Sequence, residues 1–213
     1  MKVRVLSGAW PQTERVMPMS ERGNILLRRL DKWVGIPLVA MLGAVRARRA
    51  RPERVEKIGI LALGPAGDFL LSVGSSVPVL RQAFPGCHIT VFASASNRSA
   101  TPLVPGTDAY VIVPLKNILA GLRTVRECEF DLLIDFGPWP RTSALLARLS
   151  RARFTVGFRT PRQYRHHVFD CVADHCNDRH EVENYAALLR AIGLDATGLR
   201  PRLAIQANAQ RKL

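Results

Sequence analysis

The stretch GILALGPAGDFLLSVGSSVPVL, residues 59–80, decides the fold. Its first half continues the apolar run KIGILAL (57–63), which has the length and composition of a buried strand. A glycine turn, Gly64-Pro65-Ala66-Gly67, interrupts the run, and a single carboxylate, Asp68, follows it. Apolar residues then recur at 69, 70, 73, 77, 80 and 84, the spacing of a helix packed on one side. The stretch therefore predicts a strand, a turn and a helix, the beginning of a βαβ unit.

The same alternation continues along the chain. Further strands are predicted at 88–94, 109–113, 131–137 and 153–158, and helices at 68–83, 117–128, 141–150 and 181–194. Residues 159–180 form an irregular basic stretch with no clear period. Strands that alternate with helices of this length are typical of a parallel sheet covered on both faces. The predicted fold class is α/β, a doubly wound Rossmann-like parallel sheet.

Composition and length fit one globular domain with short additions at its ends. The chain has 213 residues, of which 47% are hydrophobic and 23% are charged. We expect a basic amphipathic segment at 1–50, a Rossmann-like domain at 51–205 and a tail at 206–213. Four scattered cysteines give no disulfide framework, and the first twenty residues lack the apolar core of a signal peptide. These features predict a reduced, cytoplasmic protein. The cysteines are Cys87, Cys128, Cys171 and Cys176.

Positive charge is concentrated at the amino-terminal end. The net charge is +14, and residues 1–55 contain 12 Lys and Arg against 4 Asp and Glu. Two short amphipathic helical pieces are predicted within 24–46, with Leu38, Met41, Leu42 and Val45 on the apolar side of the second. The apolar run WVGIPLVAMLGAV (33–45) contains Pro37 and falls short of the roughly 20 residues that a spanning helix needs. We expect residues 24–54 to lie on an anionic membrane surface. Packing on the protein's own core or on a partner subunit is the alternative, and nucleic acid is the least favoured partner, since no nucleic-acid motif accompanies the charge.

Ligands of open parallel sheets bind beyond the carboxyl ends of the strands, where the turn at 64–67 is expected to lie. Gly64 and Gly67 would let a ligand approach the backbone, although neither the dinucleotide fingerprint G-x-G-x-x-G nor a P-loop is present. Asp68 has two interpretations. It can cap the helix that it begins, or it can act as a general base that takes a proton from a sugar hydroxyl. Spacing alone favours the cap.

Several motifs, in this order, resemble glycosyltransferase family 9, the ADP-heptose:lipopolysaccharide heptosyltransferases and their relatives. They are the strand followed by G-x-x-G-D, the internal proline of Ser76-Val77-Pro78-Val79-Leu80, and Phe84-Pro85-Gly86 before the next strand. The stretches FDLLIDFGPWPRTSALLARLSRARFTVGF (130–158) and His180-Glu181-Val182-Glu183-Asn184 continue the match, and LLRRLDKWVGIPLVAML (26–42) is similar to the lead of some members. The resemblance covers about residues 25–205.

The resemblance implies a two-domain GT-B enzyme, of which this chain would be the amino-terminal, acceptor-side half. It implies that Asp68 is the catalytic base, that a lipid-linked saccharide is the acceptor and that a nucleotide sugar such as ADP-heptose is the donor. It implies no metal and no further cofactor. It also implies a location on the inner face of the inner membrane, where lipopolysaccharide core is built. A proline and an alanine at 65 and 66, where relatives often have small polar residues, depart from the pattern.

After Pro201-Arg202-Leu203-Ala204-Ile205 only QANAQRKL follows, so the donor-binding half is expected to be missing. A truncated gene, a fragment and a second chain that supplies the other half remain open. Two functions follow. One is the acceptor-binding domain of a glycosyltransferase, incomplete without a second domain. The other is a non-catalytic module that holds a glycan or a partner at the membrane.

The loops after the later strands supply further candidates. Arg141 can meet an acceptor phosphate or carboxylate, or it can be a solvated residue at a helix start. Asp135 is expected to be a structural hydrogen-bond acceptor rather than a catalytic group. Tyr164, Arg165 and His166 are placed at the acceptor site only by their position after the last predicted strand. The Cys and His residues of RHHVFDCVADHCNDRHE (165–181) fit no zinc spacing, so no metal site is predicted.

Overall fold

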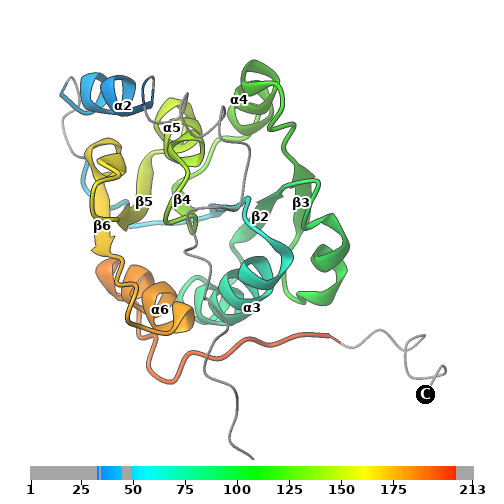
Figure 1. The fold of residues 1–213 in the computed structure, drawn as a ribbon. Coiled ribbons are helices and arrows are strands. Elements are labelled where there is room, and N and C mark those ends of the chain that lie inside the picture. The colour runs from blue at the N-terminus through cyan, green and yellow to red at the C-terminus, as the bar shows by residue number, and fades with distance from the viewer. Residues whose placement is uncertain (1–32, 34, 45–48, 205–213) are drawn as a thin grey trace, which may run out of the picture.

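A computed structural model describes residues 33, 35–44 and 49–204 of the chain. The part of the predicted amino-terminal segment before Trp33, and the tail at 206–213, lie outside these residues. The described chain forms a six-stranded parallel sheet with helices on both faces (Figure 1). The predicted α/β, doubly wound fold is therefore confirmed.

The strands are short and the helices are of ordinary length. The sheet has the strand order β3-β2-β1-β4-β5-β6, with every neighbouring pair parallel. In chain order the elements are α2 (Gly35–Ala44), β1 (Lys57–Ala62), α3 (Ala66–Ala83), β2 (His88–Ala93), η2 (Arg98–Leu103), β3 (Ala109–Ile112), α4 (Ile118–Arg126), β4 (Leu132–Asp135), α5 (Arg141–Leu149), β5 (Phe154–Arg159), η3 (Arg165–Val168), β6 (Cys171–Asp174) and α6 (Glu181–Ala191).

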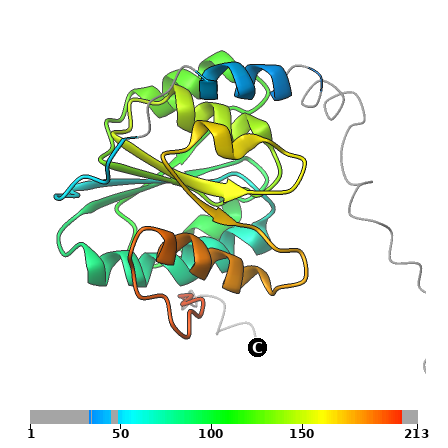
Figure 2. The ribbon, with the colours of Figure 1, turned by 90° about the vertical axis from the view of Figure 1, so that its left-hand side faces the viewer.

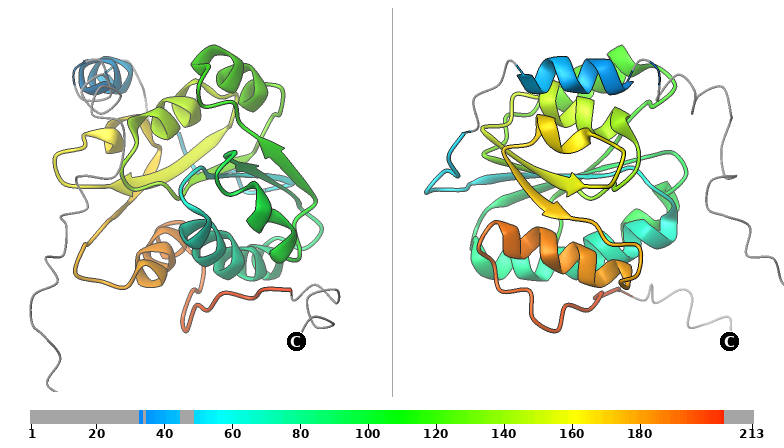
Figure 3. Two further views of the ribbon diagram at one scale, coloured as in Figure 1. Left: turned by 45° about the vertical axis from the view of Figure 1, so that its right-hand side comes forward. Right: turned by 60° about the vertical axis from the view of Figure 1, so that its left-hand side comes forward.

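Helices α3 and α6 cover one face of the sheet, while α4 and α5 cover the other (Figures 1 and 3). The short helix η3 and helix α2 lie on the second face against α5. Successive residues of β1 point to opposite faces, as the pleat requires. Ile58 and Ile60 therefore join the core under α3 and α6, and Leu61 joins the core under α4 and α5. Both faces of the sheet are buried, which explains why its strands read as continuous apolar runs.

The internal proline of α3 has a definite structural consequence. Pro78 has no N–H, so it cannot donate to the carbonyl of Gly74 one turn earlier. The backbone N–H of Arg202 donates to that carbonyl instead, at 2.9 Å. The same segment donates from the N–H of Ala204 to the carbonyl of Leu103 at 2.8 Å. The chain after Pro201 is thus fixed along α3 by a carbonyl group that the helix leaves unused.

Most predicted elements agree with the structure to within a few residues. The exceptions are η2, which forms between the strands predicted at 88–94 and 109–113, and η3 and β6, which form within the stretch predicted to be irregular. Strand β6 is only four residues long and lies at the edge of the sheet, where one neighbour, β5, supplies its hydrogen bonds. A strand of this kind needs no long apolar run, so the sequence pattern does not reveal it.

Helix α2 differs from its predicted character. Pro37 lies near the start of α2, and the helix continues through it. The helix carries no charged residue, and Met41, predicted on its apolar side, is 58% exposed. The buried contacts come from Gly35 and Val39. The amphipathic character predicted for this piece is not seen in Gly35–Ala44, because α2 is apolar on both sides. Contact of its apolar side with a membrane is still a prediction.

Candidate functional site

The sheet order creates a switch point between β1 and β4. From β1 the chain proceeds outward to β2 and β3, and then returns to place β4 on the other side of β1. The loop after β1 leads to α3 on one face, and the loop after β4 leads to α5 on the opposite face. The two loops diverge at the carboxyl edge, which is where ligands of open α/β sheets bind. The predicted site residues Gly64, Gly67 and Asp68 belong to the first of these loops and the helix that follows it.

Asp68 occupies the third position of α3 and is exposed at this edge. The N-cap of α3 is Pro65, and no side chain caps the helix. Within the described residues, the Asp68 carboxylate accepts no N–H and forms no ion pair. Its Oδ2 atom would lie 3.7 Å from a β-carbon added at Gly64, so the carboxylate lies over the turn rather than on the helix end. Asp68 therefore makes no capping hydrogen bond, although it lies in the first turn of α3, where a carboxylate meets the helix dipole favourably. Its role as a base is still a prediction.

The two glycines of the turn leave space beside the backbone, and neither adopts a backbone conformation that only glycine favours. Neither Gly64 nor Gly67 has a positive φ. A β-carbon added at Gly67 would meet nothing within 4 Å. The backbone here is open to an approaching group, as the acceptor-binding prediction requires.

A second carboxylate, Glu181, lies close enough to Asp68 to influence it. Glu181 is the first residue of α6, which packs beside α3. Partial burial raises the pKa of Asp68, and the negative charge of Glu181 raises it further. A raised pKa suits a group that must hold and release a proton near neutral pH.

Glu181 is held in place by a buried histidine. His175 Nε2 lies 3.2 Å and 3.3 Å from the two carboxylate oxygens of Glu181. The imidazole ring, only 4% exposed, meets Trp139 and Phe158 edge to face at 5.5 Å and 5.4 Å between ring centroids. Asn184 fixes the intervening loop, because its side chain exchanges two hydrogen bonds with the backbone of Cys176.

Tyr185 lies below the two carboxylates in the core. It is 1% exposed and packs edge to face on Phe136, with 5.5 Å between ring centroids. Burial and the charges of Asp68 and Glu181 raise the pKa of the Tyr185 phenol well above its ordinary value. Tyr185 therefore stays neutral and packs in the core near the two acids.

The loop after β4 is held by a buried network centred on Asp135. Its Oδ1 accepts the N–H of Gly137 at 3.0 Å, and its Oδ2 accepts the hydroxyl of Ser143 at 2.9 Å. Asp135 also forms an ion pair with Arg165, and both side chains are wholly buried. The prediction that Asp135 is a structural acceptor is confirmed. Arg165 belongs to this network and does not line a surface.

The other residues predicted to bind the acceptor, Arg141, Tyr164 and His166, have surroundings that differ from those of Asp68. Arg141 is 4% exposed, and its guanidinium donates to the carbonyls of Gln163 at 2.9 Å and Arg162 at 3.4 Å. It is therefore not solvated, and it holds the loop that follows β5. Tyr164 is 46% exposed with a φ of 59°, and His166 stacks on His167 with 4.1 Å between ring centroids. Their contact with an acceptor is still a prediction.

The cysteines and histidines of 165–181 do not gather at one point. His175 faces Glu181 and two aromatic rings, while the Cys171 thiol donates to the carbonyl of Ala191 at 3.3 Å. In the part of the chain that the structure describes, no group of three or more His, Cys, Asp or Glu side chains is placed to hold a metal ion. All four cysteines are free thiols.

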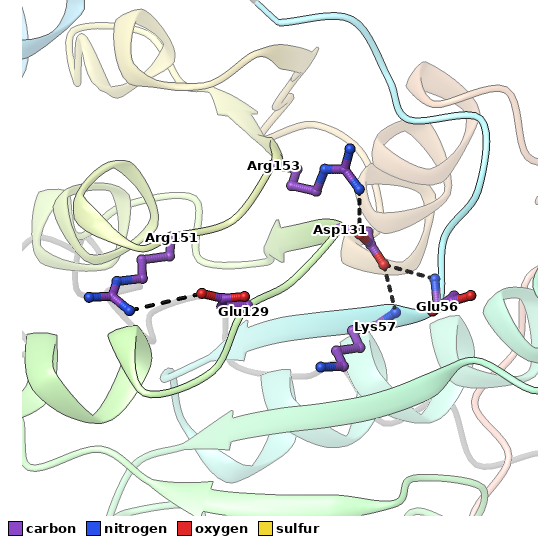
Figure 4. Close-up of a pocket in the computed structure, with 6 residues that line it drawn as sticks. All are labelled: Glu56, Lys57, Glu129, Asp131, Arg151 and Arg153. Atoms are coloured by element: carbon purple, nitrogen blue, oxygen red, sulfur yellow. Dashed lines mark hydrogen bonds and ion pairs between the residues drawn. The ribbon is translucent and has the colours of Figure 1, made fainter.

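Two open hollows lie at the opposite, amino-terminal edge of the sheet. The first, of about 360 Å³, is lined by both signs of charge: Glu56, Lys57, Glu129, Asp131, Arg151 and Arg153 (Figure 4). Asp131 accepts the backbone N–H groups of Glu56 and Lys57 at 2.9 Å and 3.1 Å and pairs with Arg153 at 3.4 Å. The second hollow adjoins it through Arg153. Arg151 pairs with Glu129 and Arg153 pairs with Asp131 across this hollow.

The carboxyl edge provides one exposed proton acceptor and, close to it, a second carboxylate that a histidine holds in place. Asp68 is the accessible acid, and Glu181, held by His175, is the neighbour whose charge raises the pKa of Asp68. The sequence analysis did not identify Glu181, His175 or Tyr185 as site residues. The motif His180-Glu181-Val182-Glu183-Asn184 was the available signal, but β6, which positions His175, was not recognised.

No protein-family model and no curated protein sequence matches the chain. Among solved structures, a family 9 glycosyltransferase of Veillonella parvula is similar, with a TM-score of 0.60, 22% identity and coverage of 78% of this chain and 49% of that one. The E. coli heptosyltransferase WaaC with ADP has a TM-score of 0.58 and 14% identity over 68% of this chain and 50% of its own. E. coli ADP-heptose lipopolysaccharide heptosyltransferase II has a TM-score of 0.59 and 21% identity over 73% and 49%.

The chain thus spans about half the length of the glycosyltransferases that it matches. At these identities the likeness concerns the fold. It confirms, at that level, the resemblance to glycosyltransferase family 9 that the sequence motifs indicated. No helix among the described residues is long and apolar enough to cross a bilayer.

Proposed function

We propose that this chain is the acceptor-binding domain of a heptosyltransferase-like enzyme. The enzyme would transfer a sugar from a nucleotide sugar, such as ADP-heptose, to a lipopolysaccharide core or a related lipid-linked glycan. The donor would bind to a second domain, on this polypeptide or on another chain, that faces the carboxyl edge. Neither a metal nor a further cofactor takes part in the proposal.

The observation that carries the proposal is the position of Asp68. It is an exposed carboxylate at the switch point of the sheet, and none of the described residues pairs with it. A cap or an ion-pair partner would be engaged by other groups of the protein. A carboxylate left open above a glycine turn is instead available to a hydroxyl group of a ligand.

In the proposed reaction, Asp68 accepts the proton of the acceptor hydroxyl as that oxygen attacks the anomeric carbon of the donor sugar. The new bond joins the acceptor oxygen to the anomeric carbon, and the bond from that carbon to the nucleotide diphosphate breaks. The diphosphate leaves with the bonding electron pair. Glu181 favours uptake of the proton by Asp68, because its charge raises the pKa of that carboxyl.

The acceptor would lie across the turn at Gly64 and Gly67, where the backbone is open. Arg141 would act indirectly, because its guanidinium holds the loop that carries Tyr164. Tyr164, exposed at the end of that loop, would contact a saccharide, and His166 would lie beside it. The facing domain would close the site, which explains why an exposed edge suffices on this half.

The basic segment at 24–54 would hold the enzyme on the anionic inner face of the inner membrane, near a lipid-linked acceptor. Attraction of roughly 1 kcal/mol for each basic residue near such a surface would concentrate the protein there.

Binding of the acceptor can be tested on the chain itself. Core oligosaccharide released from lipopolysaccharide is titrated into the labelled protein, and backbone amide shifts are followed by NMR. We expect shifts in the loops after β1 and β4 and at the start of α6, and none around Asp131 at the amino edge. Shifts confined to the amino edge would contradict the proposal.

Catalysis is tested by Asp68→Asn in the enzyme completed with its donor-binding domain. Loss of a general base should lower kcat by roughly 10²- to 10⁴-fold. Glu183→Gln, an exposed carboxylate change in the same region, is the matched control. If Asp68→Asn transferred sugar at the rate of the parent, Asp68 would not be the general base of the reaction.

A further inference from the structure

Helix α2 presents an outward face made only of apolar residues. Its inner side packs on η3 and α5 through Gly35 and Val39. Four exposed residues of the opposite side, and the helical residue Trp33 two positions before Gly35, recur at a spacing of three or four positions, with Ala40 and Met41 adjacent, and so form one stripe. We call this stripe the α2 outer face, and it consists of Trp33, Pro37, Ala40, Met41 and Ala44.

The exposure of this face is unusual for its composition. Trp33 is 76% exposed and Met41 is 58% exposed. A helix that is apolar all round is normally buried on all sides or in contact with lipid. Among the described residues, the protein covers helix α2 on one side alone, so its outer face is exposed although it is apolar.

Lipid is the occupant that best fits the chemistry of this face. The five side chains offer one polar hydrogen atom, the indole N–H of Trp33, so a protein partner would find almost nothing to hydrogen-bond. A tryptophan at one end suits the boundary between headgroups and acyl chains. In the sequence, the helix lies between Arg28, Arg29 and Lys32 on one side and Arg46 and Arg48 on the other. Such flanking charge complements anionic headgroups.

We propose that the α2 outer face docks flat in the surface of an anionic membrane, with Trp33 and Met41 inserted among the acyl chains. Ten residues are too few to cross the bilayer, so the helix lies in the membrane plane.

The course of α2 then orients the whole domain. The helix lies beside α5 and against η3, at one end of the helical layer on this face, and runs opposite in direction to the strands (Figures 2 and 3). Its first residues therefore lie toward the carboxyl edge of the sheet, and its last residues lie toward the amino edge. With α2 flat on the membrane, the strands run parallel to the lipid surface and Asp68 faces sideways along it. This last step rests on the proposed function: Asp68 begins α3, on the side of the sheet away from α2, so the saccharide of a lipid-linked acceptor would extend past the carboxyl edge to reach it while its lipid stays in the membrane.

Vesicle flotation with the full chain tests the docking without any sugar or donor, so it can fail or succeed independently of transferase activity. The probes are vesicles of phosphatidylglycerol with phosphatidylethanolamine, and neutral phosphatidylcholine vesicles. The parent should float with the anionic vesicles. Met41→Glu and Trp33→Glu should each weaken that binding by roughly tenfold, because a charge replaces an inserted apolar group. Both residues are exposed, so the fold should persist, and circular dichroism checks it.

Leu203→Glu is the matched control. Leu203 is 46% exposed and lies over Gly74 of α3, on the opposite side of the sheet from α2. It should bind like the parent. A variant that keeps Trp33 as its sole tryptophan, made with Trp10→Phe and Trp139→Phe, should show a blue shift on anionic vesicles and quenching by brominated lipid. Unchanged binding by Met41→Glu and Trp33→Glu, or a Trp33 that brominated lipid does not quench, would overturn the proposal. So would self-association of the parent without lipid that Met41→Glu abolishes, since the occupant would then be a second copy.

Discussion

Asp135 and Arg165 form an ion pair from which water is excluded, although the two residues are 30 positions apart in the sequence. The pair joins the carboxyl end of β4 to η3, an element that the sequence pattern did not predict. Ser143, at the start of α5, completes the network through its hydroxyl group. The loop that borders the candidate site thus depends on a charge pair in the core and not on apolar packing alone.

Removal of one member of this pair should destabilise the domain strongly. Arg165→Leu leaves the Asp135 carboxylate buried without its cation, so we expect a loss of about 3–5 kcal/mol in the free energy of unfolding, measured with urea. Asp135→Ala combined with Arg165→Leu should cost less than the sum of the two single changes. Arg153→Ala, which breaks an exposed pair with Asp131, should cost at most about 1 kcal/mol. Equal losses from Arg165→Leu and Arg153→Ala would contradict the importance of burial.

Asp68 should make the domain less stable as pH rises. Because its pKa in the fold lies above the ordinary value of 3.8, the folded state prefers the protonated carboxyl. Its favourable contribution is complete below about 3.8 and disappears as pH rises through the folded pKa. Asp68→Asn should therefore unfold at a higher temperature than the parent at pH 7, and the difference should vanish in acid. The gain is small, since solvent screens an exposed group. A parent that is more stable than Asp68→Asn at pH 7 would show that the carboxylate has a favourable partner in the fold.

Glu181 should account for part of the raised pKa of Asp68. In Glu181→Gln the negative charge is gone, so the pKa of Asp68 should fall toward its ordinary value. The measurement is a carboxyl-carbon NMR titration of Asp68. Glu183→Gln removes the same charge from an exposed position two residues further along α6 and should leave the titration unchanged. An equal fall in both variants would indicate a general field effect and not a specific neighbour.

Two glycines should respond in opposite ways to a methyl group. Gly67→Ala adds a β-carbon that meets nothing within 4 Å, and alanine favours the helix by up to about 1 kcal/mol, so stability should rise. In β5, the ring of Phe169 occupies the place where a β-carbon of Gly157 would go, so Gly157→Ala should destabilise by several kcal/mol. If the turn binds a saccharide, Gly67→Ala should also weaken oligosaccharide binding. A variant that is more stable and binds equally well would move the acceptor away from Gly67.

The sequence was informative where a single local pattern determines an element. The buried strand before Gly64 and the helix after Asp68 were predicted because apolar spacing fixes both. Strand β6 was missed because its four residues are stabilised by β5 and by the His175 loop, which are tertiary contacts. The inward position of Arg165 could not be read from sequence either, since an arginine beside Tyr164 and His166 has the composition of a surface loop. The sequence therefore predicted only part of the candidate site. Asp68 follows from the turn, whereas Glu181 comes close to Asp68 only because α6 packs on α3.

Pro78 gives helix α3 a role beyond covering the sheet. Because Pro78 has no N–H to donate to the carbonyl of Gly74, that carbonyl accepts the backbone N–H of Arg202 instead. A change such as Pro78→Ala would restore the helical donor and set it in competition with Arg202 for one carbonyl. A mutation more than 120 positions upstream could thereby loosen the carboxyl-terminal segment without disturbing the core. The path of residues 201–204 thus depends on Pro78, a residue of the first helix after β1.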